Sequence, residues 1–154
     1  MTRKRCHRHP ITAMPPPGLR PMLKSDQVRD LGLAHIGNLD TIARGEANEE
    51  VLWQWIGGAL TWSYVASALE KRNPQRYREA AVATRVQLEV VTAVVNRYGR
   101  TGRVGFSGVE YQQAKEACEW MDALAEVVDQ PTAIAAAEWS ERSEERRVGK
   151  ECRL

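Results

Sequence analysis

One series of apolar residues in the middle of the chain constrains its fold most strongly. After Asn48, apolar side chains recur at alternating steps of three and four, at Leu52, Trp55, Ala59, Trp62, Ala66 and Leu69. This spacing places them on one stripe of an α-helix, which has about 3.6 residues per turn. Trp53, Ile56 and Leu60 widen the apolar surface beyond that stripe. We therefore predict a helix that is central to the fold or contacts partners on two sides.

Start and stop signals predict further helices on both sides of this one. Good capping residues precede four segments: Ser25 or Asp26, Asn48, Asn73 with Pro74, and Ser107 with Glu110 three residues later. Gly45 and Gly99 are suited to the positions just past the first and third helices. The signals predict helices near residues 25–44, 48–69, 73–98, 107–128 and 132–139.

The third segment, residues 73–98, contains a stretch that could also form a strand. Its stretch Val90–Val95 is rich in β-branched residues, which by propensity alone favour a strand. Helical spacing from Tyr77 to Tyr98 outweighs that preference, and Thr84 on the stripe should bond its hydroxyl to a carbonyl one turn back. We predict an all-α, bundle-like single domain of about four long helices and a short fifth.

Charge and proline divide the chain into parts. Residues 1–24 hold six bases and no acid, whereas residues 25–141 hold eleven bases and seventeen acids. Pro15–Pro17 and other prolines in the first part fix backbone angles and remove hydrogen-bond donors. We predict a flexible, disordered, basic and proline-rich arm at residues 1–24, called the basic arm below, and one helical domain at residues 25–141.

The last thirteen residues, 142–154, resemble a short-read sequencing adapter translated in frame. This resemblance implies a metagenomic reading frame with a non-native tail, which we expect to be disordered or poorly packed. The tail contains five bases and three acids, so it accounts for the whole net charge of +2. The net charge therefore gives no support for nucleic-acid binding by the chain as a whole.

Together with the basic arm, four short motifs resemble an uncharacterised family of small helical proteins from proteobacterial prophage and phage-like regions. The motifs are Asn38–Leu39, Arg44–Ala47, Leu52–Gln54 and Thr101–Arg103 before Glu110. The resemblance covers roughly residues 1–128 and implies an association with phage. The motifs are helix ends with their caps, so they transfer no catalytic residue. Some members carry transcription-regulator labels, but no short recognition helix is evident in this sequence.

Two kinds of partner remain open. The bases Arg3, Lys4, Arg5 and Arg8 can neutralise phosphates, so the basic arm is a candidate nucleic-acid contact. The second apolar face of the central helix, Trp53, Ile56 and Leu60, is a candidate protein interface for a homodimer or an adaptor. An acidic helical domain favours the second kind of partner, and the resemblance to phage proteins favours the first.

Other clusters have plainer explanations. Cys6–His9 contains metal-binding side chains but lacks the second spaced pair of a structural zinc site. His35 has no nucleophile or carboxylate that the sequence places beside it. The loop Gly99–Gly108 alternates glycine with arginine, yet it follows a helix rather than a strand, which favours helix termination over anion binding. We predict no enzyme, metal, cofactor or small-molecule ligand.

Hydropathy and cysteine content favour a cytoplasmic protein. The longest apolar runs are interrupted by residues such as Arg85 and Glu89, well short of the roughly 20 apolar residues of a membrane span. The N-terminal bases precede no apolar run, and the three cysteines form no disulfide framework. We therefore expect no membrane partner.

Overall fold

The protein folds as five helices. The computed structural model describes residues 21–151, with side chains described for residues 21–143. The helices are α1 (Ser25–Ala43), α2 (Glu49–Arg72), α3 (Pro74–Thr101), α4 (Gly108–Val127) and α5 (Gln130–Glu151). Residues 21–151 contain no strand beyond an isolated bridge between Met22 and Asp129. The predicted all-α, bundle-like fold is confirmed.

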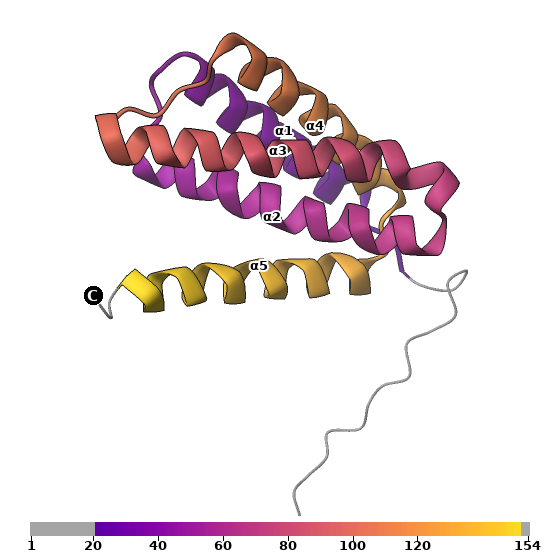
Figure 1. The fold of residues 1–154 in the computed structure, drawn as a ribbon. Helices are drawn as coiled ribbons and strands as arrows, with labels where there is room; N and C mark the ends of the chain where they lie inside the picture. The colour runs from indigo at the N-terminus through magenta and orange to yellow at the C-terminus, as the bar shows by residue number, and fades with distance from the viewer. Residues whose placement is uncertain (1–20, 152–154) are drawn as a thin grey trace, which may run out of the picture.

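Helix α2 is the centre of the arrangement. It packs against each of the other four helices, while α1 and α3 also pack against α4. Helix α5 packs along the outer side of α2 and thereby covers one side of the bundle of α1–α4 (Figure 1). The sequence predicted that this helix is central to the fold or contacts partners on two sides. In the structure, α2 is central to the fold.

The helix boundaries follow from local capping chemistry. Asn48 accepts a hydrogen bond from the amide of Val51 at 2.9 Å, and Asn73 caps α3 with Pro74 in its first turn. Ser107 and Glu110 form the predicted capping box. Gly45 has φ +72°, and the amides of Gly45 and Glu46 bond back into the last turn of α1 as in a Schellman motif.

Two boundaries differ from the prediction. The residue before α1 is Lys24 rather than Ser25 or Asp26, and its amide donates to Gln27 Oε1 at 2.9 Å. Helix α3 continues through Gly99 and ends at Gly102, which has φ +69°. Gly102 can adopt this left-handed conformation without strain, and its amide bonds back to the Tyr98 carbonyl, which closes the end of the helix.

The buried face of α3 is rotated from the predicted stripe. Val90–Val95 is helical, and the Thr84 hydroxyl donates to the Ala81 carbonyl at 3.1 Å, as predicted. Leu88 and Val95, which the helical spacing places on the predicted stripe, are only partly buried, whereas Gln87 is fully buried. Helix α3 packs against α2 and α4 together, so its buried arc is wider than a single stripe.

Helix α5 is longer than the predicted fifth helix. It begins at Gln130 and continues to Glu151, so the backbone does not change at residue 141 as the adapter resemblance implied. Residues 142–151 include several glutamates, arginines and a lysine, which have favourable helix propensity. Their composition is compatible with the continuation of the helix.

Candidate functional site

The predicted interaction face on α2 does not form one exposed surface. Trp53 is 39% exposed, but Ile56 is 1% exposed and Leu60 is 7% exposed. Ile56 and Leu60 belong to the cluster of buried residues that α1, α2, α3 and α4 share. Neighbouring helices of the same chain cover Ile56 and Leu60, so these two side chains do not form the predicted protein interface.

Helix α5 covers another part of α2. The Ser140 hydroxyl donates to the Gly57 carbonyl at 3.2 Å, and the rings of Tyr64 and Trp139 lie 5.6 Å apart. On the opposite side, a Cβ built on Gly58 would lie 3.8 Å from the His35 ring. Helix α5 therefore contacts α2 at Gly57 and α1 contacts it at Gly58, where an added Cβ would be in ordinary van der Waals contact with His35.

The predicted nucleic-acid contacts Arg3, Lys4, Arg5 and Arg8 lie outside the described residues, as does Cys6–His9. The structure does show where the basic arm joins the domain. The Gln130 amide donates to the Pro21 carbonyl at 2.7 Å, and the Gln130 side chain donates to the Met22 carbonyl at 3.0 Å. The end of the basic arm is thus attached to the corner between α4 and α5.

Charged hydrogen bonds stabilise the corner between α4 and α5. Asp129 caps α5 by accepting from the Thr132 amide at 3.1 Å, and Arg72 of α2 donates to Asp129 at 2.9 Å. Burial alone would raise the pKa of Asp129, but hydrogen bonds from Arg72 and Thr132 hold that pKa below its ordinary value. The attachment point therefore belongs to a well-bonded part of the domain.

A second charged pair fixes the loop between α3 and α4. Arg97 makes a bidentate pair with Glu110, at 2.6 and 3.0 Å, and also donates to the Gly105 carbonyl at 2.8 Å. The hydrogen bond from Arg97 is the main cause of the lowered pKa of Glu110. Glu110 also accepts from the Ser107 amide at 2.7 Å. These bonds, with Gly102 at the end of α3, give the loop the helix-ending role predicted for it.

His35 is held by a partner distant in sequence. The indole Nε1 of Trp62 donates to His35 Nε2 at 2.9 Å, and the two rings meet edge to face with centroids 5.7 Å apart. Burial lowers the pKa of His35, against the opposing influence of the Asp122 carboxylate. The imidazole is therefore neutral near pH 7, and it joins α1 to α2.

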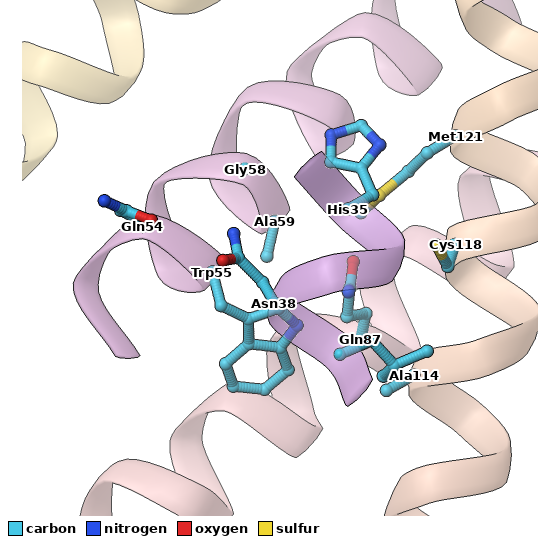
Figure 2. A pocket seen from close by; sticks show the side chains of 11 residues that line it. His35, Asn38, Gln54, Trp55, Gly58, Ala59, Gln87, Ala114, Cys118 and Met121 are labelled. Atoms are coloured by element: carbon cyan, nitrogen blue, oxygen red, sulfur yellow. The ribbon is translucent and has the colours of Figure 1, made fainter. Parts of the chain in front are cut away.

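His35 also lines a small cavity of about 20 Å³ beneath α1. The cavity lies between α1, α2, α3 and α4, and its polar lining includes Asn38, Gln87 and Cys118 (Figure 2). Burial raises the pKa of the Cys118 thiol to about 11, so the thiol is protonated at neutral pH. A protonated thiol and a cavity of this size do not constitute a nucleophile with a substrate site.

No cluster of three or more histidines, cysteines or acids that could hold a metal ion occurs among the described residues. The described helices also include none whose length and hydropathy would suit a membrane crossing. No protein-family model, curated protein or solved structure matches the chain.

Proposed function

We propose that this protein is a non-enzymatic binding module in which the basic arm contacts nucleic acid. The observation that carries the proposal is the segregation of charge, with six bases and no acid in residues 1–24 against an excess of acids in residues 25–141. A short basic segment adds affinity for phosphates without reading base sequence. We also propose an accessory role in the phage setting that the family resemblance implies, and a cytoplasmic location.

The attachment at Pro21 and Met22 supports this division of roles. Gln130 bonds the backbone of both residues, so the end of the basic arm is held at the corner between α4 and α5. The four bases to be replaced, Arg3, Lys4, Arg5 and Arg8, precede Leu23, the residue of the basic arm that packs against the buried core of the domain. Removing charge from the basic arm should therefore leave the domain folded.

The test compares two quadruple variants in a titration against short duplex DNA of random sequence. The first replaces bases of the basic arm by alanine: Arg3, Lys4, Arg5 and Arg8. The second, a control with the same change in net charge, replaces four exposed bases of the domain by alanine: Lys71, Arg78, Arg100 and Lys115. Fluorescence anisotropy measures affinity, and circular dichroism checks that both variants remain helical.

The proposal predicts that the first variant loses binding and that the second retains most of it. Equal losses in both variants would show that only net charge matters. Full binding by the first variant would place the contact on the domain and overturn the proposal.

A second candidate function is a protein-interaction module that acts as a homodimer or adaptor. The observation that favours it is on α1, where Leu33 is 64% exposed and Ile36 is 52% exposed. Ile36 borders a groove of about 280 Å³ between α1 and α4. Light scattering that gives a dimeric mass, reduced to the monomer by Leu33→Lys, would favour this function over the first.

A further inference from the structure

Helices α1 and α4, which pack against each other, carry the acidic excess of the domain (Figure 1). Together these two helices hold eight acids and two bases. Residues 25–141 hold seventeen acids and eleven bases, so the whole excess of six acids lies on α1 and α4. Helix α3, by contrast, holds five bases and two acids. Acidic charge is therefore concentrated on one pair of neighbouring helices.

The groove of about 280 Å³ between α1 and α4 has an acidic lining. Its charged residues are three acids and one base: Asp40, Glu119, Asp122 and Lys115. Asp40 pairs with Arg44 at 2.6 Å, and the Asp122 carboxylate also acts on His35. Glu119 is exposed and makes no ion pair within residues 21–143. Glu119 is therefore available to a basic ligand.

Apolar and aromatic side chains also line this groove. Ile36 is 52% exposed, Tyr111 is partly buried, and Leu39 is buried. Grooves with aromatic lining bind proline-rich segments in other proteins. The groove therefore suits a ligand that combines basic with apolar or proline residues. Charge disfavours a second copy of the same face, because that face is equally acidic.

Residues 1–20 of the basic arm have this composition. They contain five bases, four prolines and no acid. Ile11, Met14 and Leu19 place apolar side chains among the prolines. Proline-rich segments lose little conformational entropy on binding, because their backbone angles are already restricted. The basic arm therefore matches the groove in charge and in apolar content.

The attachment of the basic arm brings it to one end of the groove. The Pro21 carbonyl accepts from the Gln130 amide, three residues beyond the end of α4. The groove residues Asp122 to Tyr111 lie about 8–24 Å from that end of α4, at 1.5 Å per residue. Arg8 precedes Pro21 by 13 residues. A flexible coil of that length spans about 20 Å, so the bases of the arm can reach the groove.

We propose that the groove between α1 and α4 is an intramolecular docking site for residues 1–20 of the basic arm. The acids of the groove attract the bases of the segment Arg3–Arg8, and its apolar lining contacts the proline-rich stretch that follows. A linker whose length matches the span gives an effective concentration of about millimolar, so weak contacts suffice. Docking does not require nucleic acid. Where the proposed function holds, the groove competes with phosphates for the same bases.

Paramagnetic relaxation enhancement on the full chain tests the docking without nucleic acid. A nitroxide label is attached to Cys6 in a Cys152→Ser background. Cys118 is buried and its thiol is protonated at neutral pH, so it does not react. The label should broaden the amide signals of residues 111–122 on α4 more than those of residues 135–143 on α5.

Helix α5 is the internal control for this measurement. Helices α4 and α5 both extend from the corner where Gln130 holds Pro21, and the compared residues lie at similar distances from that corner. An arm that does not dock would approach both helices alike. Equal broadening of the two helices would therefore overturn the proposal, whereas it would leave the proposed nucleic-acid contact untouched.

A pair of double variants assigns the docking to the groove. Asp40→Lys with Glu119→Lys reverses charge in the groove, and the excess broadening of α4 should be lost. Glu79→Lys with Glu89→Lys makes the same change in net charge at exposed positions of α3 and should retain it. An unchanged excess in the groove variant, or an equal loss in both variants, would overturn the proposal.

Two further measurements keep the test decisive. If the groove variant does not fold, Asp40→Asn with Glu119→Gln replaces it and should also reduce the excess broadening of α4. Spin-labelled chains are also mixed with isotope-labelled chains that carry no spin label. Broadening of α4 that arises only in this mixture would place the basic arm of a second copy in the groove and overturn intramolecular docking.

Discussion

Replacing Ile56 by alanine tests the placement of α2 at the centre of the fold. The change removes three buried carbons, worth about 2.4 kcal/mol at roughly 0.8 kcal/mol each. A residual cavity of about 60 Å³ adds about 1.4 kcal/mol at roughly 24 cal/mol per Å³. The better helix propensity of alanine offsets about 0.4 kcal/mol. We expect Ile56→Ala to lower the free energy of unfolding by about 3.5 kcal/mol.

Ile36→Ala is the matched control, because it removes the same atoms from a helical position that is about half exposed. It should cost about 1 kcal/mol or less, since about half the area is buried and no cavity forms. Urea unfolding followed by circular dichroism measures both values by linear extrapolation. Equal losses in the two variants, or a loss below about 1.5 kcal/mol for Ile56→Ala, would refute the burial of this face of α2.

Further predictions concern glycine and titratable groups. Gly37→Ala should raise the free energy of unfolding by about 0.5–1 kcal/mol, because no atom lies near the added methyl group. Gly32→Ala should raise it by less, because the added Cβ would lie 3.1 Å from a carboxylate of α4. Thermal unfolding compares the two variants. Urea unfolding at a series of pH values should show a free energy of unfolding that falls below about pH 6.5. The pKa of His35 is lowered in the folded protein, so the unfolded chain binds a proton at a higher pH than the folded chain does. Constant stability between pH 7 and 5 would contradict this. The free energy of unfolding should fall further below about pH 4.5. The pKa values of Glu110 and Asp129 are lowered in the folded protein, so these carboxylates bind protons at a higher pH in the unfolded chain. Asp129→Ala should lower the free energy of unfolding by about 2–3 kcal/mol. It removes the cap of α5 and a charged hydrogen bond from Arg72, which is partly exposed. A loss below about 1 kcal/mol in urea unfolding would refute the role of Asp129 in stabilising this corner.

Features set by local chemistry were predictable from the sequence. The caps at Asn48, Asn73 and Ser107 depend on residues within one turn, so their spacing alone identifies them. The apolar stripe of α2 was predictable for the same reason, since helical periodicity places Trp55 and Trp62 on one buried face.

Features set by distant contacts were not predictable. Ile56 and Leu60 were assigned to a partner because nothing local shows which helices of the same chain cover α2. Gln87 is polar, so no apolar pattern marks it as buried. The bond between Trp62 and His35 joins residues 27 positions apart, and no motif in the sequence links them.

The salt dependence of duplex-DNA affinity tests the central claim most directly. If the basic arm neutralises phosphates, the logarithm of the binding constant falls linearly with the logarithm of salt concentration, with a slope of about −0.9 for each phosphate contacted. Engagement of all four bases, Arg3, Lys4, Arg5 and Arg8, predicts a slope near −3.6. A slope near zero, or no binding at low salt, would contradict the claim and leave the interaction module as the better account.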